Sequence, residues 1–203
     1  MSSGSRPTGV DQPASFSLKP EFAEQARAEV EKYPEGRQAS ALCAILDLAQ
    51  RQSGGWLSQA AMDYVADLLK VAPIRVYEVA TFYSMFNLVP IGRHHVRVCT
   101  TTPCQLRGSD DIVATCETNL GISIGETSCD GAFSLGEVEC LGACVNAPVV
   151  QIGDDYYEDV DAESVSEILE ALKQGKTPRA GPQVTRQASA PASGPTTLLD
   201  RTG

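Results

Sequence analysis

The sequence predicts an α+β protein in which a helical N-terminal region precedes a small mixed sheet covered by helices. Three observations support this. Apolar residues recur at helical spacing between residues 20 and 90, short alternating segments replace that pattern from residue 94, and small residues and proline dominate both ends. We therefore expect a flexible arm at 1–18, a helical domain at 19–92, a sheet domain at 93–175 and a disordered Pro/Ala-rich tail at 176–203.

The helical domain is expected to contain four helices. The first begins at Pro20, a residue that suits a first helical turn, and is closed by Pro34. The second spans 38–51, the third follows Ser58 as its N-cap, and a short fourth helix opens at Pro73. The apolar faces of the second and third helices consist of Leu42, Ile45, Leu46, Ala49, Met62, Val65, Leu68 and Leu69.

The segment at 80–86 carries three aromatic residues and a methionine. We interpret it as core packing, with a docking surface for a partner as the alternative.

The second region has the order β-α-β-β-α with a hairpin near its end. Strands are expected at 95–98, 133–139 and 149–152, and the last of these turns through Asp154-Asp155 into Tyr156-Tyr157. One helix covers 109–120, with Gly121 as its stop. Another begins after the cap residue Asp161 and ends at Gly175.

Composition excludes several classes of function. The net charge of −10, from 16 basic and 26 acidic residues, argues against nucleic acid as a partner. No apolar run reaches the length of a transmembrane helix, so we expect no direct membrane insertion. The N-terminus lacks a secretory h-region and the pattern of a mitochondrial transit peptide, which predicts a cytosolic chain.

The seven cysteines form two close pairs and three single residues. An odd count without a secretion signal argues against a disulfide framework. Cys99 and Cys104 are separated by four residues, and Cys140 and Cys144 by three. Each pair begins where a predicted strand ends, so a loop could turn both sulfurs to one side.

Two such pairs suit a [2Fe–2S] cluster, because each of its two irons needs two thiolates. A zinc site is the main alternative on spacing alone, and an unmetallated structural role is a third. A thioredoxin-type redox dithiol needs C-x-x-C, which is absent. His94 and His95 do not suit a Rieske-type centre, because neighbours on a strand point to opposite faces.

The remaining cysteines have simpler interpretations. Cys43 and Cys116 lie among apolar neighbours and are predicted core residues. Cys129 precedes an Asp-Gly turn and is the one cysteine that could replace a ligand in a mis-assembled site.

Four separated motifs stand out along the chain. They are C-T-T-T-P-C-Q-L-R-G at 99–108, V-E-C-L-G-A-C-V-N-A-P at 138–148, V-Y-E-V-A-T-F-Y-S-M-F at 76–86 and D-Y-Y-E-D at 155–159. In order and spacing these motifs resemble the 24 kDa [2Fe–2S] subunits of respiratory NADH:quinone oxidoreductase (complex I), and the similarity covers roughly residues 20–175.

The resemblance implies a thioredoxin-like [2Fe–2S] ferredoxin domain behind the helical domain. It implies that Cys99 and Cys104 hold one iron and that Cys140 and Cys144 hold the other. Thioredoxin-like folds often contain a cis-proline facing the first loop, and Ala147-Pro148 is the candidate.

The resemblance also implies partners. In that family the subunit docks on a flavoprotein that binds NADH and FMN, beside other peripheral-arm subunits of complex I. This chain has neither G-x-G-x-x-G nor a Walker loop. NADH delivers two electrons together, so a flavin on the partner must separate them for a one-electron centre.

We therefore expect an electron-transfer subunit of NADH dehydrogenase (quinone), an electron carrier without its own NADH site. Its expected location is cytoplasmic, at the cytoplasmic face of the inner membrane, or on the matrix side if mitochondrial. The alternatives are a diaphorase subunit of a soluble NAD-linked hydrogenase or formate dehydrogenase, and a stand-alone ferredoxin or zinc-binding module. An acidic stretch at 126–170, without Lys or Arg, predicts a low cluster potential.

Overall fold

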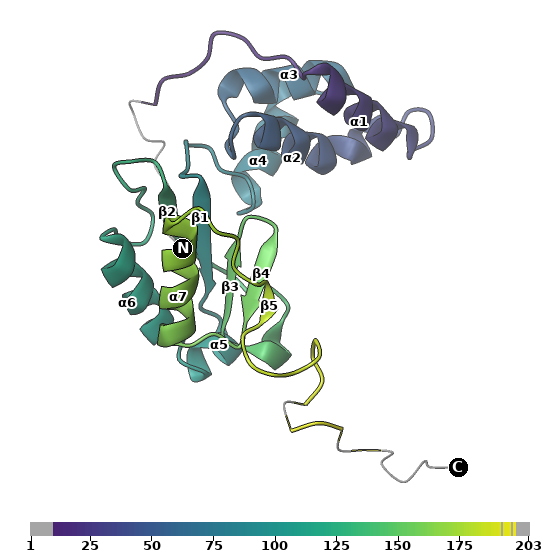
Figure 1. The fold of residues 1–203 in the computed structure, drawn as a ribbon. Helices are drawn as coiled ribbons and strands as arrows, with labels where there is room; N and C mark the ends of the chain where they lie inside the picture. The colour runs from purple at the N-terminus through teal and green to yellow at the C-terminus, as the bar shows by residue number, and fades with distance from the viewer. Residues whose placement is uncertain (1–9, 192, 196, 198–203) are drawn as a thin grey trace. The chain divides into compact units, whose positions relative to one another are not determined.

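A computed structural model describes residues 10–191, 193–195 and 197 (Figure 1). The chain forms two compact units that divide between Ile91 and Gly92. The parts of the predicted arm and tail at 1–9, 192, 196 and 198–203 lie outside the described residues. The α+β class and the helices-then-sheet order are confirmed.

The first unit is helical, as predicted. Its helices are α1 (Pro20–Glu31), α2 (Leu42–Gln52), α3 (Gln59–Leu69) and α4 (Pro73–Phe82), with a 3-10 turn, η1 (Gln38–Ala41), before α2. Ser58 caps α3 as expected, since its hydroxyl accepts a hydrogen bond from the Ala61 N–H at 3.2 Å.

The predicted apolar faces are buried with one exception. All four named residues of α2 are buried, and so are Met62, Val65 and Leu69 of α3. Leu68 is 41% exposed, so its place in the predicted stripe was wrong. It lies three positions from Val65 at the edge of the buried face, where the helical period turns it toward solvent.

The core interpretation of residues 80–86 was wrong for three of its four large apolar side chains. Ala80 and Phe86 are buried, but Phe82, Tyr83 and Met85 are 79%, 45% and 44% exposed. That interpretation relied on the aromatic and methionine content of the segment. The helix ends at Phe82 and Tyr83 is extended, so the side chains that follow no longer share one buried helical face.

Part of the N-terminal segment packs on this unit. The Phe16 and Tyr64 rings meet edge to face, with centroids 5.5 Å apart, and Leu18 is buried. The flexibility of 1–18 stays a prediction.

The second unit is built on a five-stranded mixed sheet of order β2-β1-β3-β4-β5. Its strands are β1 (His94–Cys99), β2 (Phe133–Val138), β3 (Val149–Ile152), β4 (Asp155–Glu158) and β5 (Gly181–Pro182). β1 is parallel to β2 and antiparallel to β3, and the predicted hairpin joins β3 to β4. The parallel pair brings the carboxyl ends of β1 and β2 to the same edge.

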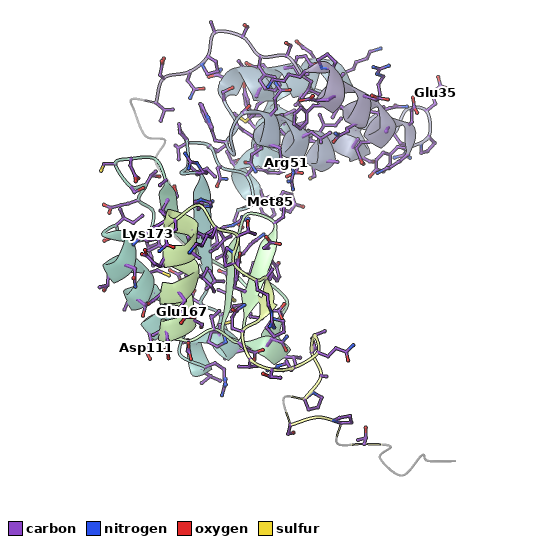
Figure 2. All side chains as sticks on the ribbon, viewed as in Figure 1. Glu35, Arg51, Met85, Asp111, Glu167 and Lys173 are labelled. Carbon is purple, nitrogen blue, oxygen red and sulfur yellow. The ribbon has the colours of Figure 1, made fainter. Side chains whose placement is uncertain are left out.

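Two helices, α6 (Ser109–Leu120) and α7 (Ala162–Lys173), lie side by side against the sheet (Figure 1). Their apolar faces complete a core with one face of the strands, made of Val96, Val98, Ile112, Cys116, Phe133, Leu135, Val150, Ile152, Val165, Ile168 and Leu169, with others. On their outer faces Asp111 and Glu167 point to solvent, while the exposed Lys173 of α7 donates from its Nζ to the Asn119 carbonyl of α6 at 2.9 Å (Figure 2).

The residues predicted to cap or end these two helices are confirmed. Gly121 takes the left-handed conformation at the C-cap of α6, with φ of 66°. Asp161 caps α7 in a capping box with Ser164, and Gly175 follows the end of α7 with φ of 71°.

One α-helix and one strand were not predicted. A short helix, α5 (Thr102–Leu106), occupies the loop after β1, and β5 lies within the predicted tail. The described part of that tail therefore includes a two-residue strand paired with β4, while the disorder of 176–203 stays a prediction. The Ala147–Pro148 peptide bond is cis, as expected.

In the part of the chain that the structure describes, no helix has the length and apolar character needed to cross a bilayer.

His95 is a neutral ring packed against the sheet. Burial, and then the nearby Arg97 charge, lower its pKa to about 4. A Cβ at Gly136 would lie 3.1 Å from the His95 Nε2 atom, so glycine gives this ring room on β2.

This packing of His95 predicts that the folded chain loses stability in acid. Between pH 6.5 and about 4 the unfolded chain binds a proton at His95 that the folded chain does not, so stability falls as pH falls through this window. We expect His95→Gln to remove about 1–3 kcal/mol of that loss. Urea unfolding at pH 7.5 and 4.5, followed by circular dichroism, measures it.

The control is His94→Gln. Burial also lowers the pKa of His94, but by less than it lowers the pKa of His95. An equal pH dependence in wild type and His95→Gln would contradict the prediction.

Candidate metal centre

The two cysteine loops leave the sheet at neighbouring positions. Parallel pairing places Cys99, the last residue of β1, opposite Val138, the last residue of β2. The Thr100 N–H donates to the Val138 carbonyl at 3.4 Å, just beyond this pair. Cys140 lies two residues past Val138, so both loops start from one edge.

The first pair is closed by α5. Pro103 stands in its first turn, a position where the missing N–H costs no hydrogen bond. The helical turn carries Cys104 back toward Cys99, and both residues are only 1% exposed. They pack with Ala147 and Val149 in a small separate cluster.

The second pair lies at the surface. The sulfurs of Cys140 and Cys144 are 3.3 Å apart, and both residues are exposed. Gly142 turns the loop between them with φ of 83°, a conformation that disfavours other residues. A 3-10 turn, η2 (Cys144–Asn146), then leads into β3.

The two loops also contact each other. The Thr101 hydroxyl lies 3.3 Å from the Cys99 sulfur and hydrogen-bonds the Cys140 sulfur as well. The Leu141 backbone N–H, from the second loop, hydrogen-bonds Cys99 in the first. All four predicted ligands are thereby brought together at one edge of the sheet.

Hydrogen bonds make Cys99 and Cys140 the more acidic thiols. Burial raises the pKa of Cys99, but bonds from Thr101 and Leu141 outweigh it, and the pKa lies below its ordinary value. The pKa of Cys140 is lowered first by the Cys144 thiol and then by the Gly142 N–H.

Their partners keep their protons more strongly. Burial, and then the bond to Cys99, raise the pKa of Cys104 to about 12. The bond to Cys140, and then burial, raise the pKa of Cys144. Within each pair one thiol therefore ionises before the other, and metal binding must release the protons that remain on the ligands.

Among the described residues, no group of three or more His, Cys, Asp or Glu side chains is arranged around a single ion position. The four thiols instead lie as two contacting pairs.

The other cysteines and the two histidines have different surroundings. Cys116 is fully buried in the sheet core, as expected, and Cys43 is partly buried against the helical core. Cys129 is exposed. The His94 ring packs on Phe133, with centroids 5.2 Å apart, and His95 packs near Gly136.

Sequence reasoning missed the backbone donors. The spacing of the cysteines does not show that the Leu141 N–H reaches Cys99 or that the Val149 N–H bonds Cys104. Those contacts depend on the sheet order, which local periodicity does not reveal.

Comparison with known proteins identifies a family. Residues 26–173 match the model of the thioredoxin-like [2Fe-2S] ferredoxin family. The chain is 51% identical over 184 residues, 89% of this chain and 74% of the other, to "NADH dehydrogenase [ubiquinone] flavoprotein 2, mitochondrial" of Dictyostelium discoideum. It is 55% identical over 158 residues, 78% of this chain and 95% of the other, to a subunit of the NADH-quinone oxidoreductase of Rickettsia bellii.

A solved structure shares the fold. A chain of an NAD+-reducing [NiFe]-hydrogenase in the air-oxidized state matches 64% of this chain with a TM-score of 0.56 and 19% identity. The match covers 23% of the hydrogenase chain.

The residues present fit the cluster that this family carries. Two pairs of thiols would provide two ligands for each of two irons. Backbone N–H groups of Leu141, Gly142 and Val149 and the Thr101 hydroxyl are directed at the sulfurs, where they favour the thiolate forms that ligate iron.

These thiol contacts predict the reactivity of the metal-free chain. At pH 7.5 under reducing conditions, iodoacetamide should alkylate Cys140 faster than Cys144, because the thiolate is the nucleophile. Thr101→Val should slow alkylation of Cys140 roughly threefold, by removing a hydrogen bond to its thiolate. Mass spectrometry of the labelled peptides measures both rates.

The control is Thr115→Val, since the Thr115 hydroxyl bonds the Asp111 carbonyl within α6. Equal rates at Cys140 and Cys144, or an unchanged rate in Thr101→Val, would show that these contacts do not set thiol acidity.

Proposed function

The chain belongs to the thioredoxin-like [2Fe-2S] ferredoxin family, and from this premise we propose that it is the electron-transfer subunit of an NADH:quinone oxidoreductase. The observation that carries the proposal is the identity of 51% and 55% to subunits of such enzymes, over most of the chain. The convergence of four thiols at one sheet edge supplies the chemistry.

The proposed ligands are Cys99, Cys104, Cys140 and Cys144, the first two for one iron and the last two for the other. When bound, the [2Fe–2S] cluster supplies reversible one-electron transfer. The chain's own groups do the rest. α5 and β3 bury Cys99 and Cys104 away from water, and the donors to sulfur stabilise negative charge on the ligands.

The exposed second pair gives the site its open side. Cys140 and Cys144 are exposed, in contrast to the buried first pair. A redox partner that approaches this side meets no covering layer from the described part of this chain over those two ligands. Electron exchange is therefore proposed to occur past Cys140 and Cys144.

The proposed partner is a flavoprotein subunit that binds NADH and FMN. The sequence carries no recognisable nucleotide-binding motif, and hydride chemistry needs a carrier that can separate two electrons. The remaining partners are other peripheral subunits of the same complex. The proposed location is the cytoplasmic face of the inner membrane, or the matrix side in a mitochondrion.

The diaphorase alternative receives less support. The hydrogenase match, at 19% identity, shows a shared fold alone, whereas the quinone-oxidoreductase relatives match at 51% or more. Co-purification with quinone-reducing subunits, or instead with a hydrogenase or formate dehydrogenase, distinguishes the two.

Serine substitutions test the ligand set. Cys99→Ser, Cys104→Ser and the double change Cys140→Ser/Cys144→Ser should each lose most of the iron and acid-labile sulfide, because serine leaves an iron short of a thiolate. The anaerobically purified wild type should carry about two of each per chain and give an EPR signal when reduced.

Cys129→Ser is the matched control, since it changes an exposed cysteine outside the two pairs. Wild type without iron, or a double variant with unchanged iron and EPR, would refute the assignment. Zinc in place of iron would favour the zinc-module alternative.

The acidic residues after β2 predict an effect on potential. The carboxylate of Glu137 accepts a hydrogen bond from the hydroxyl of Thr100, the residue after Cys99, and Glu139 precedes Cys140. Because reduction adds negative charge, Glu137→Gln/Glu139→Gln should raise the midpoint potential on the order of tens of millivolts, and less at high salt. EPR-monitored redox titration measures the change.

Glu167→Gln/Glu170→Gln is the control, because it removes the same charge from α7. An equal shift in both double variants, or none in either, would show that local charge beside the ligands does not set the potential.

A further inference from the structure

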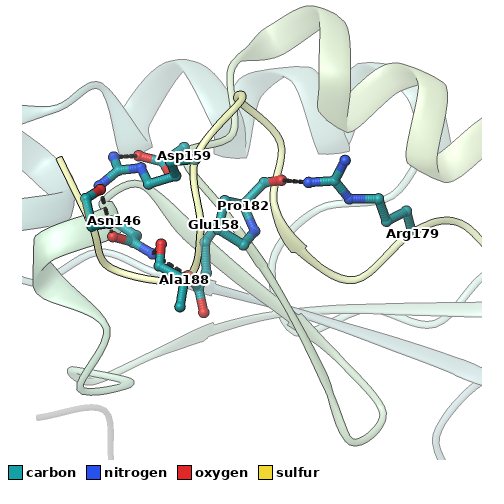
Figure 3. A network of polar contacts seen from close by, with 8 residues as sticks. Asn146, Glu158, Asp159, Arg179, Pro182 and Ala188 are labelled. Carbon is teal, nitrogen blue, oxygen red and sulfur yellow. Dashed lines mark hydrogen bonds and ion pairs between the residues drawn. The ribbon is translucent and has the colours of Figure 1, made fainter. Parts of the chain in front are cut away.

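A buried polar network links the C-terminal segment (residues 179–190) to the second cysteine loop. Figure 3 shows its central residues, with Asn146 and Asp159 on one side and Ala188 nearby. Asn146 lies two residues after Cys144, at the end of η2, and is only 1% exposed. Any group that holds Asn146 also holds the turn that carries Cys144.

Asn146 is held through both its side chain and its backbone. Its Oδ1 accepts a hydrogen bond from Arg186 Nη1 at 3.0 Å, and its Nδ2 donates to the Glu158 carboxylate and to the Ala188 carbonyl, the latter at 3.2 Å. Its own carbonyl accepts from the Asp159 N–H at 2.7 Å. The end of β4 and the C-terminal segment therefore both fix this residue.

Arg186 contacts both Asn146 and Asp159, through separate nitrogens of its guanidinium. While Nη1 reaches Asn146, Nη2 forms an ion pair with Asp159, and the two charged side chains are 12% and 7% exposed. A guanidinium can make both contacts with a fixed angle between them, whereas a lysine ammonium is a single point charge.

The backbone around Asp159 needs such support. Asp159 has φ of 54°, in the left-handed region that non-glycine residues seldom adopt. Its N–H and carboxylate are the groups bonded to Asn146 and Arg186. A conformation of this kind persists when surrounding contacts determine it.

The segment that supplies Arg186 is itself attached to the sheet. Gly181 and Pro182 pair with Tyr157 and Glu158 of β4, and the Gln183 N–H donates to the Glu158 carbonyl at 2.8 Å. This anchor ends three residues before Arg186.

We propose that Arg186 is a positioning residue for the ligand Cys144, acting through Asn146 and Asp159, an inference that rests on the proposed function of the four cysteines. The exposed pair is the more open half of the site, and Cys144 stands on a short turn. The C-terminal segment supplies the rigidity that this turn lacks. Loss of the guanidinium should loosen Cys144 and open a route for iron release.

The test compares Arg186→Met with Arg179→Met in the full chain. Arg179 lies in the same segment, and its Nη2 donates to the Pro182 carbonyl at 2.7 Å, a contact that stays within the segment (Figure 3). The readouts are the rate of iron transfer to a chelator, the EPR spectrum and the midpoint potential of the reduced protein.

We expect Arg186→Met to bind cluster but to release iron about tenfold faster than wild type, with an altered EPR spectrum and potential. Arg179→Met should match wild type in all three. Arg186→Lys should recover the rate only in part, since it restores the charge and not the two-point contact. Asp159→Asn should have the same effect as Arg186→Met, and combining the two should add little.

Equal release rates, spectra and potentials in Arg186→Met, Asp159→Asn and Arg179→Met, with full iron content in all, would overturn this inference and leave the proposed function intact. A wild type that binds no iron would refute the proposed function itself. If Arg186→Met fails to fold, the comparison of Arg186→Lys and Asp159→Asn with Arg179→Met decides the matter by the same measurements.

Discussion

The parallel pairing of β1 with β2 is the constraint on which the candidate site depends. It sets Cys99 opposite Val138, so that two loops from distant parts of the sequence begin side by side. β3 then runs antiparallel to β1, which brings the start of β3 and its Val149 N–H back to the same edge. Cys99 of β1, the loop after β2 and the start of β3 thus bring sulfurs or donors to one edge of the sheet, and no single loop could do so alone.

Within that volume the two halves differ in solvation. Cys99 and Cys104 are buried, whereas Cys140 and Cys144 are exposed. Burial raises the pKa of Cys104, whereas hydrogen bonds lower the pKa of Cys99, and the pKa is likewise lowered at Cys140 and raised at Cys144. The buried half keeps water away from its two sulfurs, and the exposed half gives access to a redox partner. An electron carrier requires both. The exposed half then needs support from elsewhere, and the C-terminal segment lies where it can give that support.

Much of this could be predicted from local pattern. Strand alternation, helix caps such as Ser58 and Asp161, and the spacing of the cysteine pairs all depend on nearby residues, and they located the elements and the ligand candidates. The failures share a different cause. The exposure of Phe82 depends on where α4 ends, which apolar content does not show. The bond from Leu141 to Cys99 and the ion pair of Arg186 with Asp159 join residues far apart in the chain, and no periodicity marks them.

Iron K-edge X-ray absorption of the anaerobically purified chain tests the central claim most directly. If four thiols in two pairs hold a pair of irons, each iron should have a shell of sulfur alone and a short iron–iron vector should be present. Replacing Cys140 and Cys144 together should remove that vector. A single metal ion surrounded by four sulfurs, with no second metal nearby, would contradict the account.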